Sequence, residues 1–163
     1  MYVPKPLQPN FVISSEKSQP NILVSGHIEC CNQSGFEILY HGESKNSWIG
    51  HVVLNPVDDT VAVWARCPIC GKLIPIFNSL TNGYDRCVEG ENEKKTLHKE
   101  QFRCIKCQRE IFQVAITFEY PQKEELLSDG ISDYENGFSW IWVSLTCASC
   151  NRKYRNIIDL ETA

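Results

Sequence analysis

The chain has 163 residues, of which 42% are hydrophobic and 22% are charged, and its formal net charge is −4. This size and composition are typical of a globular protein with one domain or two small ones. The acidic balance argues against a dedicated nucleic-acid binder, and the longest apolar stretch (138–145) is far too short to span a bilayer.

The first half of the chain is predicted to contain mostly strands. Residues 1–21 hold four prolines and a polar run, which predict an extended or disordered arm. Residues 22–90 are predicted to form an N-terminal β half, because apolar residues alternate at 36–40 and again at 61–65. The segment 74–77 predicts an edge strand, since Pro75 cannot donate to a ladder.

Residues 91–163 are predicted to form a C-terminal half. The polar stretch 91–100 is compatible with a short helix, and a polar loop at 121–137 joins two apolar strands. Three strands with period-two alternation are predicted at 112–120, 138–146 and 154–160. The fold class that follows is mainly β, with antiparallel sheets and little helix.

Cysteine is the most informative residue type. The chain has nine cysteines, and six of them fall in three C-x2-C pairs: Cys67/Cys70, Cys104/Cys107 and Cys147/Cys150. Disulfide frameworks rarely repeat one spacing three times, whereas metal sites do. The odd total argues against a fully oxidised secreted protein, and residues 1–10 lack the apolar run of a secretory signal. We therefore expect a cytoplasmic protein whose thiolates stay reduced.

Two C-x2-C pairs on tight turns can direct four thiolates at one zinc ion. We predict that Cys104, Cys107, Cys147 and Cys150 form one such site. The pair Cys67/Cys70 then needs two further ligands, and the candidates are Cys30, Cys31, Cys87, His27, His41, His51 and His98. Cys30 and Cys31 are favoured because a strand precedes them, as one precedes Cys67. Two zinc ions are expected, with iron as a substitute.

A second pairing stays open at this stage. In it, Cys67/Cys70 join Cys104/Cys107, and the last pair, Cys147/Cys150, is left over. The first pairing is favoured because two turns that share one ion need to be carried by adjacent strands.

The C-terminal motifs resemble a known architecture. The segments 102–107 and 145–150, each followed by an apolar strand, resemble the two knuckles of a zinc ribbon, where a knuckle is a turn that carries a C-x2-C pair. The resemblance covers 101–163 well and 61–77 in part, and it is nearest to uncharacterised bacterial zinc-ribbon proteins. Gln108 and Asn151 stand where those knuckles have glycine, and 39 residues separate the two pairs, which is long for a ribbon.

Sites of four cysteines leave no open coordination position, so we expect a protein that is not an enzyme. The favoured function is a zinc-binding module that interacts with another protein, of a bacterial immunity or adaptor type. The long loops at 78–100 and 121–137 are the expected binding elements. Neither composition nor motif predicts a membrane partner.

The sequence is compatible with two other functions. A nucleic-acid-binding ribbon would use Arg152, Lys153 and Arg155, with Tyr154 available for base stacking. A zinc deaminase would use His27-x-Glu29 with the Cys67/Cys70 pair, which resembles the H-x-E and P-C-x-x-C signature of that class. The deaminase is the least favoured, because Arg66 replaces the expected proline and both motifs are predicted to lie beside strands rather than at helix starts.

Overall fold

Strand β9 (Ile111–Tyr120) is the centre of the fold in the computed structural model, which describes residues 1–46, 51–90 and 95–163. Its even-numbered residues, from Phe112 to Tyr120, are buried, whereas its odd-numbered residues are exposed or half-buried. This alternation arises because successive side chains of a strand point to opposite faces. The strand predicted at 112–120 is therefore confirmed.

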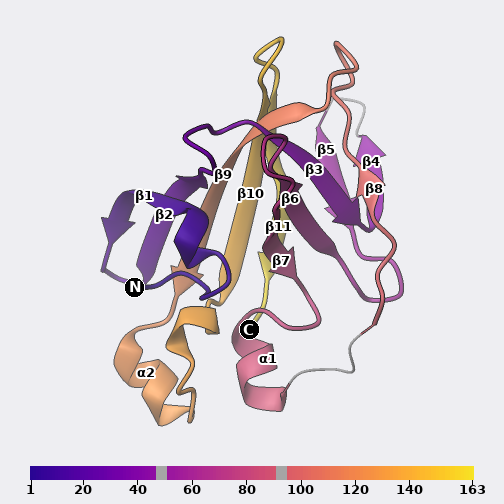
Figure 1. The fold of residues 1–163 in the computed structure, drawn as a ribbon. Coiled ribbons are helices and arrows are strands. Elements are labelled where there is room, and N and C mark those ends of the chain that lie inside the picture. Colours follow the sequence, from indigo (N-terminus) through magenta and orange to yellow (C-terminus); the bar gives the residue numbers. More distant parts are fainter. Residues whose placement is uncertain (47–50, 91–94) are drawn as a thin grey trace.

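Antiparallel strands flank β9 on both sides (Figure 1). On one side lie β10 (Trp140–Cys147) and then β11 (Lys153–Glu161). The other side is shared by two strands, β2 (Ile22–Ile28) and β3 (Phe36–His41). Beyond β2 the sheet continues with β1 (Phe11–Lys17). Beyond β3 it continues with β6 (Ala62–Arg66) and then β7 (Leu73–Asn78), and β3 also pairs with the short strand β8 (Glu100–Gln101). A separate hairpin contains β4 (Glu43–Asn46) and β5 (Val52–Asn55).

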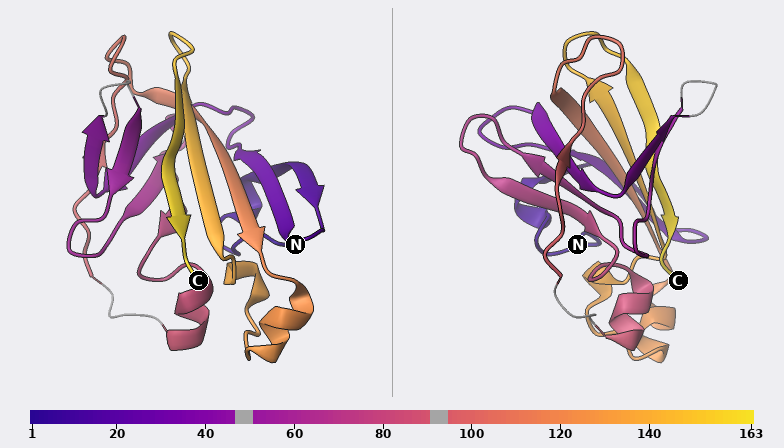
Figure 2. Two further views of the ribbon diagram at one scale, coloured as in Figure 1. Left: turned by 180° about the vertical axis from the view of Figure 1, so that it is seen from behind. Right: turned by 90° about the vertical axis from the view of Figure 1, so that its right-hand side faces the viewer.

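Helices are short. Among the described residues the helical elements are η1 (Gln8–Asn10), α1 (Tyr84–Glu89), α2 (Lys123–Ser128) and η2 (Tyr134–Asn136). Both α-helices lie at the end of the molecule opposite the turns 104–109 and 147–152 (Figure 2). The prediction of a mainly β, antiparallel fold with little helix is confirmed. None of the helices in the described ranges is long and apolar enough to cross a membrane.

Two local expectations have different outcomes. The strand with Pro75 is β7, which ends the strand order of the sheet, so its prediction as an edge strand is confirmed. The helix considered at 91–100 does not form in its described part: residues 95–99 are irregular and β8 begins at Glu100. The rest of that segment, 91–94, lies outside the described residues.

The two predicted halves share one sheet. β9, which belongs to the half 91–163, pairs with β2 and β3 of the half 22–90. Hydrophobic side chains from both halves also lie in one core cluster. The polar segment that separates the halves in the sequence therefore does not separate two packing units.

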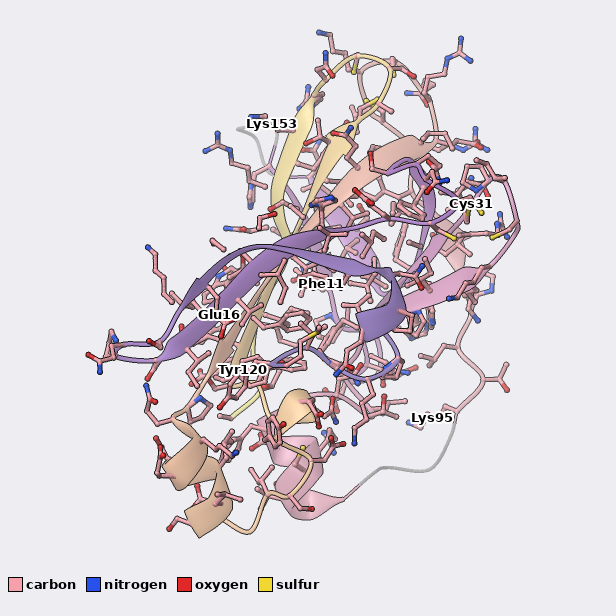
Figure 3. The ribbon with its side chains drawn as sticks, turned by 60° about the vertical axis from the view of Figure 1, so that its left-hand side comes forward. Phe11, Glu16, Cys31, Lys95, Tyr120 and Lys153 are labelled. Atoms are coloured by element: carbon pink, nitrogen blue, oxygen red, sulfur yellow. The ribbon has the colours of Figure 1, made fainter. Side chains whose placement is uncertain are left out.

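The N-terminal residues, expected to be an extended or disordered arm, are packed. Val3, Leu7 and Phe11 are 0%, 1% and 7% exposed. The Phe11 ring lies over Gly26 of β2, where an added Cβ would be only 2.6 Å from a ring carbon. Figure 3 shows Phe11 directed into the molecule. The extended part of this segment is thus strand β1, and its apolar residues cover one end of the core.

Aromatic residues fill the inner side of the sheet. Phe102, Phe112 and Tyr154 meet edge-to-face, with ring centroids 5.2–6.0 Å apart. Such edge-to-face pairs stabilise beyond the area that they bury. On β10, in contrast, Trp140 and Trp142 face away from this core and are half-buried. The apolar β10 therefore has one covered face and one partly open face.

Candidate metal centres

Four cysteines from two turns come together at one end of the sheet, and we call Cys104, Cys107, Cys147 and Cys150 the C-terminal cluster. Their sulfur atoms all lie within 4.8 Å of one another. The Sγ–Sγ distance is 3.6 Å for Cys104 and Cys150, and 3.5 Å for Cys107 and Cys147. Sulfurs ~2.3 Å from a tetrahedral zinc ion would lie about 3.8 Å apart, so the cluster has the size for one ion. The predicted grouping is the one that the structure shows.

Strand register explains why these two turns meet. The turn 104–109 leads into β9, and β10 ends at Cys147, where the turn 147–152 begins. β9 and β10 are antiparallel with Cys147 opposite Phe112, and the backbone N–H of Ala148 donates to the Ile111 carbonyl at 2.9 Å. The knuckles therefore lie at the same end of the sheet, whatever the length of the connection between the strands.

The three C-x2-C pairs lie on turns with the same backbone hydrogen bonds, at 67–72, 104–109 and 147–152. In each turn the carbonyl of the first cysteine accepts a hydrogen bond from the fifth residue, and its N–H donates to the carbonyl of the sixth, at 2.8–2.9 Å. The fifth residue of each turn is left-handed: Gly71 (φ 75°), Gln108 (φ 62°) and Asn151 (φ 60°). The absence of glycine from the last two turns therefore leaves their conformation unchanged.

The protein core shields the C-terminal cluster. Cys104 and Cys147 are buried, and the other two cysteines are half-buried. The Tyr154 hydroxyl donates to Cys104 Sγ at 3.1 Å and accepts a hydrogen bond from the Ile105 N–H at 2.9 Å. Burial opposes ionisation of Cys104, but the Tyr154 hydroxyl and backbone N–H groups of the turn lower its pKa to about 6. The thiolate, which is the form that binds metal, is thus favoured here.

The change Tyr154→Phe is expected to lower the free energy of unfolding by about 1–2 kcal/mol and to speed metal release to a chelator. It leaves the Ile105 N–H without its acceptor and Cys104 without its hydroxyl donor. The matched control is Tyr40→Phe, which removes a hydroxyl bonded to Glu100 outside both clusters. Denaturant titration and chelator kinetics measure both effects. Equal release rates in the two variants would contradict a role of Tyr154 at the cluster.

A second group of four sulfurs is built from the other half of the sequence, and we call Cys30, Cys31, Cys67 and Cys70 the N-terminal cluster. These sulfurs also lie within 4.8 Å of one another. Cys30 Sγ is 3.6 Å from Cys70 Sγ and 3.9 Å from Cys31 Sγ. The favoured partners of Cys67/Cys70 are therefore the ones found beside them, and the alternative pairing with Cys104/Cys107 does not form.

Cys30 and Cys31 lie in a tight turn between β2 and β3. Cys30 and Gln33 exchange both backbone hydrogen bonds, at 3.0 and 3.1 Å, and the two central residues, Cys31 and Asn32, have φ of 55° and 57°. Two consecutive positive φ angles are characteristic of a type I′ turn. Asparagine suits this conformation, whereas the left-handed region costs another residue type about 1–2 kcal/mol. This conformation places both neighbouring sulfurs beside the 67–72 turn.

The N-terminal cluster is more open to solvent than the C-terminal one. Cys31 and Cys70 are exposed, and only Cys67 is buried. Figure 3 shows Cys31 on an outer loop. Burial and the neighbouring thiols raise the pKa of Cys30 to about 12, while backbone N–H groups of the turn, acting against burial, lower the pKa of Cys67 to about 6. Four thiolates at this separation would repel one another, so without a cation some of the sulfurs keep their protons, and a bound cation would replace those protons.

The N-terminal cluster is expected to lose its ion to a chelator before the C-terminal cluster does. The first reason is its exposure. The second is that, in the described part of the chain, the side-chain donor found on its sulfurs is Gln33 (Nε2 to Cys67 Sγ, 3.5 Å) rather than a core tyrosine. Alkylation during chelation, followed by peptide mass spectrometry, should label Cys30, Cys31 and Cys70 first. Cys87, which belongs to neither cluster, serves as the control because its labelling should not depend on the chelator. Labelling of Cys104 or Cys147 before Cys31 would contradict this order.

The other proposed ligands lie elsewhere. Neither Cys87 nor any of the histidines considered for this site (His27, His41, His51 and His98) belongs to a group of potential metal ligands found in the described residues. Cys87 is on α1, with its Sγ 3.9 Å from the Asp133 carbonyl oxygen. His27 lies on strand β2, with its Nε2 atom 2.9 Å from Glu29 Oε1, and it is not in the group of potential ligands that contains Cys67 and Cys70.

The two long loops predicted to bind a partner contact each other, and we call residues 78–90 and 121–137 the helical end. Asn136 accepts a hydrogen bond from Asn82 at 3.1 Å and donates one to the Thr81 carbonyl at 2.9 Å. The Tyr84 hydroxyl also donates to Asp129. Exposed carboxylates are concentrated on this end: Asp85, Glu89, Glu124, Glu125, Asp129 and Asp133. The sequence predicted two long connections, but neither the short helices in them nor their contact with each other.

Comparison of this chain with protein-family models, with curated proteins and with solved structures finds no match. The assignment of both clusters as metal sites therefore rests on sulfur geometry and cysteine chemistry.

Proposed function

We propose that this chain is a non-catalytic zinc protein, in which two four-cysteine sites hold the sheet in shape so that it can bind another protein. The observation that carries the proposal is that each cluster brings together four sulfurs at the separation that one tetrahedral ion requires. An ion held by four thiolates has no open position for a substrate, so its role is structural. Iron also accepts this geometry and is the alternative ion.

The helical end supports the protein-binding part of the proposal. Two exposed apolar side chains, Val88 and Leu127, are each 56% exposed among its carboxylates. Large apolar side chains within a polar rim are typical of protein-binding surfaces. An adaptor or immunity-type protein would use such an end to hold its partner while the metal clusters keep the opposite end of the sheet closed.

Affinity capture with the metal-loaded chain tests this function. A partner retained by the native chain should be lost, or weakened about tenfold, with the triple variant Glu124→Gln/Glu125→Gln/Leu127→Ser, because both the charges and the apolar contact are removed. The matched control is Glu43→Gln/Lys45→Gln on the distant strand β4. Retention of no protein by the native chain would refute the binding function. Cytidine or adenosine turnover that is lost in Glu29→Gln would refute its non-catalytic character.

Metal content gives a direct prediction. Purified reduced protein is expected to carry close to two zinc ions per chain, since both clusters have the size for one ion. Elemental analysis combined with native mass spectrometry measures this ratio. One ion per chain, with the N-terminal cysteines reactive from the start, would refute the second site.

Nucleic-acid binding is the second candidate, and basic side chains around the C-terminal cluster favour it. They are Arg103, Lys106, Arg109, Arg152, Lys153 and Arg155. Arg103 is paired with Glu110 at 2.9 Å, and a zinc ion with four thiolates carries a net charge of −2, so these cations also neutralise the site itself. Retention on immobilised DNA or RNA that falls steeply with salt would support this candidate over protein binding.

A further inference from the structure

Two tryptophans stack on the outer face of the sheet at the start of β10, next to the helical end and at the end of the strand opposite the turn that carries Cys147. The rings of Trp140 and Trp142 on β10 have centroids 5.7 Å apart and an interplanar angle of 16°. The residues between and after them, Ile141 and Val143, point inward and are fully buried. The two indoles therefore lie outside the hydrophobic core to which β10 contributes Ile141 and Val143. Seen from behind, β9, β10 and β11 lie in front of the rest of the sheet (Figure 2, left).

Carboxylates border the two indoles on both neighbouring strands. Trp140 stands opposite Glu119 of β9 and Glu161 of β11, and Trp142 stands opposite Asp159. Residues directly opposite in an antiparallel pair lie on the same face, with Cβ atoms about 4.5–5.5 Å apart. Asp159 also accepts a hydrogen bond from Trp140 Nε1 at 2.7 Å, which fixes that ring. Three acidic side chains thus border the aromatic surface, and Thr117 borders it beside Trp142 on β9.

The same face becomes basic toward the C-terminal cluster. Lys153 stands opposite Thr146, and Arg155 is exposed on the same strand, β11. Thr146 is four residues from Trp142, which separates the two regions by about 13 Å along the strand. The charge of this face therefore changes sign along β10 and β11. A nucleic acid would meet phosphate-repelling carboxylates at the only stacked indoles of the described residues.

We propose that the Trp140–Trp142 face binds an extended basic segment of a partner protein. An arginine or lysine side chain of the segment would lie on the exposed indole surface and pair with Glu119, Asp159 or Glu161. A cation over an indole is attracted by the ring quadrupole, and nearby carboxylates add Coulomb attraction to the same cation. The inference rests on the proposed protein-binding function and names the chemistry of a partner at a second surface.

The probe is an acetylated and amidated seven-residue peptide of alternating serine and arginine, and the protein is the metal-loaded full chain. Titration followed by NMR is expected to shift the indole N–H signals of Trp140 and Trp142. The signal of Trp64 is the internal control, because Trp64 is buried under Lys99. The same peptide with citrulline in place of arginine keeps the shape without the charge, and it should bind at least about tenfold more weakly.

Two variants examine the two parts of the surface. Glu119→Gln/Glu161→Gln keeps the indoles and should weaken binding of the arginine peptide about fivefold to tenfold. Trp142→Thr should weaken that binding by the same factor, provided that thermal melting shows that the variant stays folded. Lys153→Gln should leave peptide binding unchanged. Equal binding of the citrulline peptide, no shift with either peptide, or binding of oligo(dT) that Lys153→Gln abolishes would each overturn the proposal. A captured partner that still binds Trp142→Thr would overturn it while leaving the proposed function intact.

Discussion

Cys147→Ser is expected to remove one metal ion and to lower the free energy of unfolding by at least about 4 kcal/mol. Cys147 is fully buried, ends β10 and lies opposite Phe112 at the start of β9. Losing its thiolate opens the site that joins the turns of β9 and β10. Since β9 also pairs with β2 and β3, we expect the whole sheet to lose stability rather than its C-terminal part alone.

The measurements for Cys147→Ser are metal content by native mass spectrometry and thermal unfolding. A loss of about 4 kcal/mol corresponds to a melting temperature lower by about 8–16 °C for a chain of this size. Cys87→Ser should keep both ions, because Cys87 belongs to neither cluster. Cys30→Ser should lose one ion with a smaller drop in stability, since its cluster is exposed. A Cys147→Ser protein that keeps two ions would disprove the assignment of the C-terminal cluster.

The C-terminal cluster could be predicted because its determinants are local. A C-x2-C turn has one compact geometry, and two apolar strands of similar length that pair antiparallel must bring their turns together. The three turns indeed share their hydrogen bonds, including those with Gln108 and Asn151 at the left-handed position. The residue at the left-handed position differs among the three turns, and it affects the free energy of forming the turn more than the shape of the turn.

The partners of Cys67/Cys70 were harder to predict, because they depend on which distant strands pair. Cys30 and Cys31 reach Cys67 and Cys70 only because β3 pairs with β6, which places the turns before and after those strands at the same end of the sheet. No periodicity of 22–77 shows that pairing. The left-handed φ of Cys31 could not be predicted from the sequence either, because cysteine carries no turn signal and only its neighbour Asn32 does.

The central position of β9 was not visible in the sequence either. The polar stretch was predicted to separate an N-terminal from a C-terminal half of the chain, and β9 pairs with strands from both. Strand alternation reports which face of a strand is buried and carries no information on its neighbours. The outer Trp140–Trp142 pair shows the same limit: alternation separated the two faces of β10, but only the packing of the folded chain shows which face is covered.

The N-terminal segment provides the clearest difference between pattern and packing, and a second large effect follows from it. Deleting residues 2–10 is expected to lower the free energy of unfolding by about 4–6 kcal/mol. The deletion removes Val3 and Leu7, which are fully buried, and it uncovers Phe11 and the aromatic side chains beneath it. The prolines in this segment limit regular secondary structure, and for that reason the pattern predicted an arm. They do not prevent the apolar side chains from packing against the core.

A point variant separates packing from chain length in this segment. Leu7→Ala alone is expected to cost about 2–5 kcal/mol, because it leaves a cavity in the core. Val12→Ala is the matched control: Val12 is 39% exposed on β1, so its change should stay within about 0.5 kcal/mol. Denaturant unfolding of the metal-loaded proteins measures all three variants. If residues 1–21 were a disordered arm, the deletion and Leu7→Ala would both unfold like the native chain, and the packing of this segment against the core would be refuted.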